Sequence, residues 1–462
     1  MSTARTRRWP ARTAVVLAAA AAAGAAMPAA EARPPKGDTA RVSEGPKGEQ
    51  LDGPSHTLGL SADGRSALFT STATNLLPEA GTPNLNEIYV RDLRNGHIER
   101  VSVADDGSTL NAMTFQASIS ADGRYVAFST SATNVLPGQP KHYSDVFVRD
   151  RWTGRTELVT ADGLPGTGDQ SPFEATSPSI SADGRYVAYV SNRGDLAPGA
   201  GAAGGTNNVY VTDRWTHTSR LVTVGADGAA ADSNSFSPTI GADGSTVGFG
   251  SRAENLLPDA PAASASASAS ASAEAGSPGL ARRPRYYPYY VWKADTGRIS
   301  GASLDAAGQL NPVAYDARIS PDGRYALYSL PTSPGNARTD VYLHELATGK
   351  LTKVNNGLPG TTANGDASGG AMTADGRWVY FDSDADNLVP DDTNHAYDVF
   401  RRDLWTGSVE RVSLTRDGRQ STASSHGPYV DATGDTVIFD ASDGDLVPGD
   451  TNILQDVFLR RP

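Results

Sequence analysis

The stretch Ser-Ala-Asp-Gly-Arg-Tyr-Val-Ala-Phe occupies residues 120–128, and its first five residues recur along the chain. Seven copies, some of them altered, stand at intervals of 53 to 79 residues. Their third positions are Asp63, Asp122, Asp183, Asp243, Asp322, Asp375 and Thr433. A period of this length indicates a repeat architecture, in which each copy is one supersecondary unit that needs its neighbours to bury its apolar face.

Each Asp-Gly lies between two short runs of β-forming residues, as in 116–120 before it and 125–131 after it. This pattern predicts the tip of a β-hairpin. A third run follows in every copy, for example 145–148, and most copies then show a Gly-containing turn and a fourth run. Four antiparallel strands (a to d) in each of seven repeats predict an all-β, seven-bladed β-propeller.

The first strand of each repeat has the features of the strand nearest a propeller axis. Small residues stand two before the turn residue in most copies, as the narrow end of a wedge requires. The position before them is apolar in all seven copies: Leu60, Ile119, Ile180, Ile240, Ile319, Met372 and Val430. We therefore expect strand a to be innermost.

The two ends of the array predict how the ring closes. The last repeat stops at Pro462 after its third strand, 456–460. The missing fourth strand matches residues 39–43, whose Arg-Val-Ser also ends the first repeat at 100–102. We expect residues about 39–44 to pair with 456–460 as the outermost strand of the last blade.

These repeats resemble the TolB-like, or WD-repeat-like, β-propeller family, whose repeats carry a Ser-Ala-Asp-Gly-Arg or Ser-Pro-Asp-Gly-Arg turn followed by an Asp-Val-Phe-Val type of strand. The resemblance covers about 41–460 and implies the propeller fold, but no particular activity, because propellers host many functions. TolB itself has six blades and a separate N-terminal domain. The seven repeats of this chain therefore do not imply a role in the Tol envelope machinery.

The N-terminus predicts export. Four arginines, Arg5, Arg7, Arg8 and Arg12, precede an apolar run at 14–27 that is too short to span a bilayer. Residues 1–32 are interpreted as a signal peptide cleaved after Ala32, and the Arg pair at 7–8 leaves the twin-arginine route open. We expect residues 33–462 to form one secreted domain, extracellular or periplasmic, monomeric and without a transmembrane segment.

The net charge indicates which classes of binding partner are favoured. The formal net charge is −12, and loss of residues 1–32, with four Arg and one Glu, leaves −15. This acidity disfavours nucleic acid and anionic membranes as partners and favours cations or basic molecules. The chain has no cysteine, which excludes disulfides and thiolate metal sites.

Loop lengths predict which face of the ring is functional. The a–b and c–d turns are tight and share one face, whereas the b–c and d–a connections are long and share the other. We call these the short-loop face and the long-loop face, and expect ligands at the long-loop face. An Ala/Ser-rich tract at about 259–284, in the fourth b–c loop, is expected to be a disordered insertion.

Two b–c loops carry oxygen-bearing residues at a common spacing. These residues are Asp392, Asn394 and Asp398 in the sixth repeat and Asp450, Asn452 and Asp456 in the seventh. Calcium requires six to eight oxygen ligands, so the pattern makes calcium a candidate cofactor. Alternatively, these side chains cap turns and hold the start of the third strand.

The residue seven before each turn residue is expected at the mouth of the central channel on the long-loop face. Candidate binding residues at this position are His56, Phe115, Phe236, Tyr315 and His426. Closure makes the first and seventh blades neighbours, so the two histidines are expected to face each other. The resemblance implies metal-holding channel histidines in TolB-like pectic-sugar lyases, but two imidazoles are an incomplete set, and solvated surface histidines are the alternative.

No Gly-x-Ser-x-Gly motif supports nucleophilic catalysis. Trp152, Trp215 and Trp405 recur at one place in the c–d turn, and this repetition favours a structural role over ligand stacking. The leading hypothesis is an exported, non-enzymatic binding or scaffold propeller that presents long polar loops to a protein, peptide or glycan. The alternative is a propeller-type polysaccharide lyase or glycosidase acting at the channel mouth.

Overall fold

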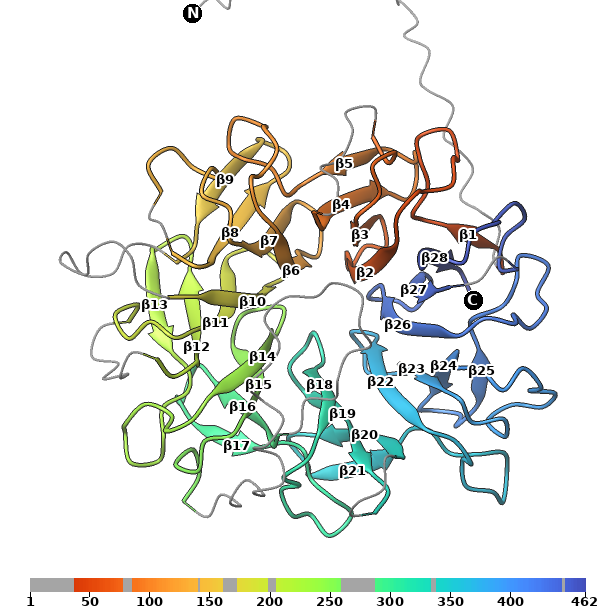
Figure 1. Ribbon diagram of the computed structural model, residues 1–462. Coiled ribbons are helices and arrows are strands. Elements are labelled where there is room, and N and C mark those ends of the chain that lie inside the picture. Colours follow the sequence, from red (N-terminus) through yellow and green to blue (C-terminus); the bar gives the residue numbers. More distant parts are fainter. Residues whose placement is uncertain are drawn as a thin grey trace, which may run out of the picture. The chain divides into compact units, whose positions relative to one another are not determined.

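The computed structural model describes residues 37–77, 85–139, 142–160, 173–197, 205–258, 287–333, 338–442 and 445–462. In these ranges the chain forms 28 β-strands and no helix, and so no helix that could cross a membrane. The strands make seven four-stranded antiparallel sheets arranged in a ring (Figure 1). The seven-bladed propeller predicted from the repeats is confirmed. The predicted signal peptide at 1–32 and the predicted insertion at about 259–284 lie outside the described residues.

The blades follow one another along the chain. From the inner to the outer strand, blade 1 is β2 Ser55–Leu60, β3 Ser66–Ser71, β4 Glu87–Asp92 and β5 Ile98–Arg100; blade 2 is β6 Thr114–Ile119, β7 Tyr125–Thr130, β8 Asp145–Asp150 and β9 Arg155–Leu158. Blade 3 is β10 Ala175–Ile180, β11 Tyr186–Ser191, β12 Asn208–Asp213 and β13 Thr218–Leu221; blade 4 is β14 Ser235–Ile240, β15 Thr246–Ser251, β16 Tyr289–Lys293 and β17 Ile299–Gly301. Blade 5 is β18 Tyr315–Ile319, β19 Tyr325–Pro331, β20 Thr339–Glu345 and β21 Lys350–Lys353; blade 6 is β22 Ala367–Met372, β23 Trp378–Ser383, β24 Asp398–Asp403 and β25 Val409–Arg411. Blade 7 is β26 Ser425–Val430, β27 Val437–Ala441, β28 Asp456–Arg460 and β1 Thr39–Arg41.

The recurrent pentapeptide forms the tight a–b turn that its sequence predicts. The Ser120 hydroxyl donates to the Asp122 carboxylate at 2.8 Å and accepts the Tyr125 N–H at 2.9 Å. Gly123 has a φ of 72°, a left-handed conformation that favours glycine. The same hydroxyl-to-Asp bond forms in blades 1, 3, 5 and 6. The small residue is therefore needed for its hydroxyl as well as for the narrow space near the axis.

Backbone hydrogen bonds also join the a–b turns of neighbouring blades. Three run from Ala121 to Ala182, from Ala182 to Ala242 and from Ala242 to Pro321, and two more run from Ala374 to Ala432 and from Ala432 to Ala62. Pro321 has no N–H and cannot extend the series to Ala374. The last of these bonds links blade 7 to blade 1, so it ties the ring across its closure.

Aromatic pairs between the second and third strands fill the core. Phe128 and Phe147 lie directly opposite each other in the ladder, with ring centroids 5.8 Å apart. Equivalent pairs are Phe69–Tyr89, Tyr189–Tyr210, Phe249–Tyr290, Tyr328–Tyr342, Phe381–Phe400 and Phe439–Phe458. Each such pair contributes about 0.5–1.5 kcal/mol beyond the burial of its area. Because apolar clusters combine residues of adjacent blades, the same side chains hold neighbouring blades together.

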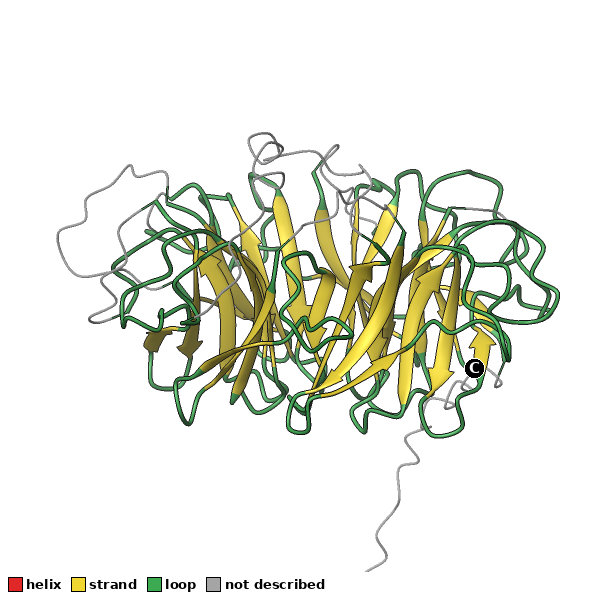
Figure 2. Cartoon of the chain, turned by 90° about the horizontal axis from the view of Figure 1, so that it is seen from below, coloured by secondary structure: helices red, strands yellow, loops and turns green. Residues whose placement is uncertain are grey.

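The N-terminal strand closes the ring as predicted. Strand β1 runs antiparallel to β28, with Thr39 opposite Arg460 and Arg41 opposite Phe458, and lies beside it in Figure 1. The Val42 N–H then donates to the Val457 carbonyl at 2.7 Å. The regular strand is shorter than the predicted range 39–44. The strands run across the thickness of the ring, with loops at its two faces (Figure 2).

Candidate functional site

Every innermost strand shifts its ladder register near the long-loop end. The shift lies directly after the predicted channel-mouth position, or one residue beyond it, in six blades, and in blade 2 it includes Phe115 itself. In four blades the residue after the mouth position has a positive φ: 55° at Ser177, 45° at Ser237, 47° at Asp316 and 60° at Gly427. A left-handed non-glycine residue costs about 1–3 kcal/mol, and bulges re-aim the side chains around them. The innermost strands therefore give up regular pairing where they meet the channel mouth.

Two mouth histidines face carboxylates of the preceding blade. His56 Nδ1 on β2 lies 3.6 Å from Asp440 Oδ2 on β27, and His426 Nδ1 on β26 lies 3.7 Å from Asp382 Oδ2 on β23. The histidine side chains are 36% and 43% exposed, and the carboxylates 12% and 9%. Strands β2 and β26 are neighbours, joined by a 3.2 Å bond from Thr57 Oγ1 to the Gly427 carbonyl. The structure thus places both predicted histidines in one sector of the mouth, each with a carboxylate partner.

Backbone groups hold both carboxylates in place. Asp440 Oδ1 accepts the Thr57 N–H at 2.7 Å, and Asp382 Oδ2 accepts the Gly427 N–H at 3.1 Å. Each bond crosses from one blade to the innermost strand of the next. The two carboxylates therefore keep their positions whether or not a histidine is protonated.

His426 also contacts an aromatic ring from the blade 6 loop. The Tyr397 ring lies 4.9 Å from the imidazole, and its hydroxyl donates to Asp366 Oδ2 at 3.0 Å. Burial raises the pKa of Tyr397 above its usual range, and the negative charge of Asp366 adds to this effect. For His426, burial lowers the pKa, but the hydrogen bond and charge of Asp382, with Asp440, outweigh it and raise the pKa. We call His56, Asp366, Asp382, Tyr397, His426 and Asp440 the acidic sector.

The other predicted mouth residues lie elsewhere on the ring. Phe236 of blade 4 stacks on Tyr287 at 4.5 Å, and the Arg252 guanidinium lies 5.5 and 5.4 Å from the two rings. Phe115 on β6 and Tyr315 on β18 are half-buried. The mouth is therefore divided between an acidic, imidazole-bearing sector and aromatic positions on other blades.

Sequence reasoning missed Asp382 and Asp440 because it compared only the innermost strands. These two residues belong to the second strands, where the equivalent positions carry Thr70, Ser129, Val190, Gly250 and Ser329. A carboxylate in an otherwise uncharged, buried strand is rare unless it is paired. A comparison of the second strands would therefore have singled out Asp382 and Asp440 from the sequence.

The sixth blade's calcium-like residues surround an arginine. Arg411 Nη2 lies 2.9 Å from Asp392 Oδ2, and Arg411 Nε lies 3.2 Å from Asp398 Oδ2. The Asn394 amide donates to Asp398 at 3.1 Å and to the Ser421 carbonyl at 2.9 Å. The structure brings the three predicted residues together, and a guanidinium lies between the two carboxylates.

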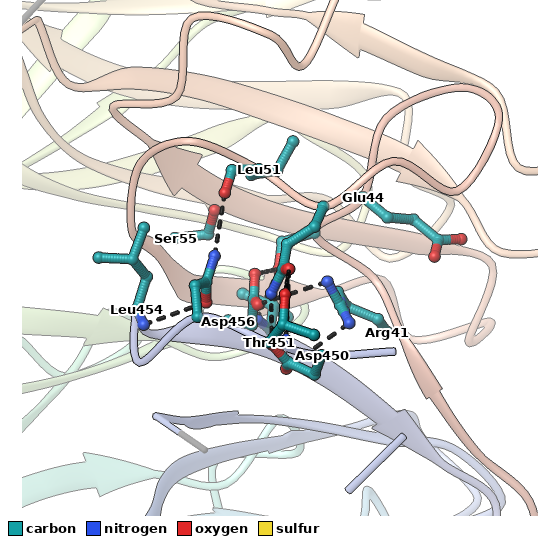
Figure 3. A network of polar contacts seen from close by, with 12 residues as sticks. Arg41, Glu44, Leu51, Ser55, Asp450, Thr451, Leu454 and Asp456 are labelled. Carbon is teal, nitrogen blue, oxygen red and sulfur yellow. Dashed lines mark hydrogen bonds and ion pairs between the residues drawn. The ribbon is translucent and has the colours of Figure 1, made fainter. Parts of the chain in front are cut away.

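The seventh blade repeats this arrangement across the closure (Figure 3). Arg41 of β1 lies 3.6 Å from Asp450 Oδ2 and 3.8 Å from Asp456 Oδ2. Asn452 donates to the Leu51 carbonyl at 3.1 Å, which joins the loop to the first blade. The predicted calcium-ligand set of this blade therefore also contains a buried arginine.

Asp398 and Asp456 belong to a bridge that recurs between the third and fourth strands. The Ser413 hydroxyl donates to Asp398 at 2.6 Å and accepts the Val399 N–H at 3.0 Å. A hydroxyl makes the same donation from Thr160 to Asp145, from Thr223 to Asn208 and from Ser43 to Asp456, and the Asn355 amide makes it to Asp340. Burial raises the pKa of Asp398 and of Asp456 to about 6. The second carboxylate of each set adds to this rise, whereas the serine hydroxyl and the arginine oppose it. In the described ranges, no group of three or more His, Cys, Asp or Glu side chains is placed to hold a metal. Calcium binding at these loops stays a prediction.

Comparison with known proteins shows similarity only at the level of fold. No family model matches the sequence, and no curated protein matches it. An oligogalacturonate lyase in complex with manganese is 12% identical, with a TM-score of 0.52 over 92% of this chain and 93% of that chain. The oligogalacturonate lyase of Vibrio parahaemolyticus is 13% identical, with a TM-score of 0.50 over 92% and 98%. A putative TolB from Agrobacterium tumefaciens is 15% identical, with a TM-score of 0.38 over 65% and 79%. At these identities the similarity to the two lyases shows a shared β-propeller fold alone.

Proposed function

We propose that this protein is an exported binding propeller that takes a positively charged group of a protein, peptide or glycan in the acidic sector of its channel mouth. The observation that carries the proposal is the pair of neighbouring His–Asp contacts, His56 with Asp440 and His426 with Asp382. The signal-like sequence of residues 1–32 supports export.

The chemistry of the acidic sector suits a cation. Asp366, Asp382 and Asp440 supply carboxylate oxygens, and Tyr397 supplies a ring face that attracts an ammonium or guanidinium group. Carboxylates held by backbone N–H groups are preorganised, so little reorganisation opposes binding. The net charge of −15 without residues 1–32 also raises the local concentration of cations at low salt.

Titration calorimetry with a lysine-rich peptide tests this function. Asp382→Asn and Asp440→Asn keep an acceptor for the backbone N–H but remove the charge, so each should weaken binding five- to thirty-fold, about 1–2 kcal/mol. Asp322→Asn, at an exposed turn on the opposite face, is the matched control and should leave the affinity unchanged. Equal affinities for all four proteins would contradict the proposal, as would affinity that does not fall with rising salt.

A second candidate is a polysaccharide lyase or glycosidase at the same mouth. It is favoured by the orientation of both imidazoles toward carboxylates, an arrangement that suits a general base. Incubation with oligogalacturonate, followed by measurement of new chain ends, tests it. Turnover that His426→Ala or His56→Ala abolishes would establish the enzyme. Binding that depends on Asp382, without turnover, would support the binding module.

A further inference from the structure

Three tryptophans on the short-loop face are largely exposed to solvent. Trp152, Trp215 and Trp405 are 68%, 64% and 71% exposed, at the same place in the c–d turns of blades 2, 3 and 6. The other exposed large hydrophobic residues in the described part of the chain are Tyr143 and Ile453, which lie in b–c loops at the other face. Exposure of this extent is more than the structural role predicted from the sequence requires of these side chains.

The c–d turn does not need an indole. Arg94, Asp295 and Ala347 occupy the same position in blades 1, 4 and 5. These turns keep the closing hydrogen bond, from the turn glycine N–H to the carbonyl four residues before it, at 2.8–2.9 Å. The turns with Trp152 and Trp405 have the same bond at 2.8 Å. Because residues as different as Arg, Asp and Ala support this turn, its geometry does not explain the tryptophans.

Each indole stacks on an arginine side chain, which a carboxylate and a second aromatic ring hold in place. The Arg124 guanidinium lies 4.7 Å from the Trp152 ring and 4.6 Å from the Tyr125 ring, and it bonds Asp150 at 3.0 and 2.6 Å. The same sandwich forms around Arg185 in blade 3 and Arg377 in blade 6. Arg324, in a blade without the tryptophan, pairs instead with its own turn residue Asp322 at 2.8 Å. One ring face is thus covered and held, which leaves the other for a ligand.

From this arrangement we infer a second binding surface, the tryptophan platform, formed by Trp152, Trp215 and Trp405, which binds the pyranose rings of a glycan chain. A sugar presents a flat C–H face that stacks on an indole, while its hydroxyl groups need hydrogen-bonding partners around the ring. Exposed threonines follow each indole directly, at Thr153, Thr216 and Thr406, and offer such partners.

The dispersed layout favours a glycan over other occupants. A protein interface has a contiguous apolar core, whereas each platform indole is surrounded by charged and hydroxyl-bearing residues. An acidic chain is also repelled by anionic lipid. A polysaccharide repeats along its length, so one chain can engage more than one indole, as at Trp152 and Trp215 of adjacent blades 2 and 3. Its affinity then exceeds that of any single contact.

Affinity electrophoresis through a panel of polysaccharides (cellulose oligomers, xylan, chitin oligomers and pectate) tests the platform. We expect retention of the wild type, with about tenfold weaker affinity for each indole removed in Trp152→Ala, Trp215→Ala and Trp405→Ala, a loss of about 1.4 kcal/mol per step. Ala347 shows that alanine suits this turn, so the variants should melt like the wild type. Tyrosine at all three positions should restore most of the retention, because it keeps a stacking ring.

Two controls test the assignment to these indoles. Arg94→Ala, at the equivalent turn position of blade 1, should leave polysaccharide retention unchanged, because that turn carries no indole. Ligand-induced change in tryptophan fluorescence should disappear in the triple alanine variant. The inference is overturned if no polysaccharide in the panel retains the wild type, or if the triple variant is retained equally. Indole-dependent binding to zwitterionic lipid vesicles, without polysaccharide retention, would also overturn it.

Discussion

The Ser43 hydroxyl donates a 2.6 Å hydrogen bond to the carboxylate of Asp456, joining residues that lie 413 positions apart in the chain. The same hydroxyl accepts the Val457 N–H at 2.8 Å. Within blade 6, Ser413 makes the same two bonds to Asp398 and Val399. The N-terminal segment therefore completes the last blade with the bond that other blades form inside one repeat.

Deletion of residues 33–46 should destabilise the propeller by several kcal/mol. The deletion removes β1, leaves buried Asp450 and Asp456 without Arg41, and exposes β28 as an edge strand. Breaking a buried ion pair alone costs about 3–5 kcal/mol. The effect is measured by comparing the thermal melting of the deletion variant with that of the chain that begins at Arg33. Identical melting temperatures would show that β1 does not hold the ring closed.

Calcium dependence should appear, or increase, when Arg411 is replaced. Arg411→Gln removes the guanidinium between Asp392 and Asp398 and leaves two carboxylates and the Asn394 amide for a cation. Saturating calcium, at a hundred times its dissociation constant, then stabilises by about 2.7 kcal/mol. Melting curves with calcium and with chelator are compared for the variant and the wild type. If the variant melts at the same temperature with calcium and with chelator, these loops do not bind calcium. If calcium stabilises the wild type as much as the variant, the ion binds beside the arginine and does not need its removal.

Stability should respond to pH through Asp398. Its pKa in the folded chain is raised to about 6 from 3.8, mainly by burial, so the folded state holds this proton more tightly than the unfolded state. The resulting stabilisation is complete below pH 3.8 and is lost as pH rises to about 6. Asp398→Asn cannot ionise, so its stability relative to the wild type should rise by up to about 3 kcal/mol across this window. Urea unfolding at several pH values measures this.

Asp417 provides a control for the direction in which stability changes with pH. Asp417 is exposed, and a hydrogen bond from Thr415, with Arg419, lowers its pKa. Its contribution to stability is present above the unfolded pKa and is lost as pH falls, so Asp417→Asn should lose stability relative to the wild type as pH rises. If Asp398→Asn and Asp417→Asn shift in the same direction, burial does not govern Asp398.

Binding of a cationic peptide should strengthen as pH rises through the pKa of His426. That pKa is raised because the interaction with Asp382 outweighs the effect of burial. Protonated His426 neutralises Asp382 and repels a cation, so affinity should be low while this imidazole is protonated and should increase as the pH rises and the imidazole loses its proton. Calorimetry on His426→Gln should give a shallower pH dependence. A wild-type affinity that is independent of pH, or that falls with rising pH, would contradict the role of this imidazole.

The sequence by itself determined the fold, the number of blades and the closure. Seven recurrent turns, six of them Asp-Gly, a small hydroxyl residue two positions before most of them and an Arg-Val-Ser segment at 41–43 were enough. Each of these features acts through local turn chemistry or strand pairing. The sequence also placed His56 and His426 in neighbouring blades, since ring closure follows from repeat order alone.

Only the tertiary structure decided which groups from separate strands and turns meet. His426 lies beside Asp382, which belongs to the second strand of another blade. Asp392 and Asp398 both pair with Arg411, and Trp152 stacks on Arg124 of a separate turn. These contacts depend on strand register and on the packing of one blade against the next, which bring together residues that share no short-range pattern. Repeat comparison predicts what is common to all blades, whereas charge pairing and exposure depend on the neighbours that the closed ring supplies.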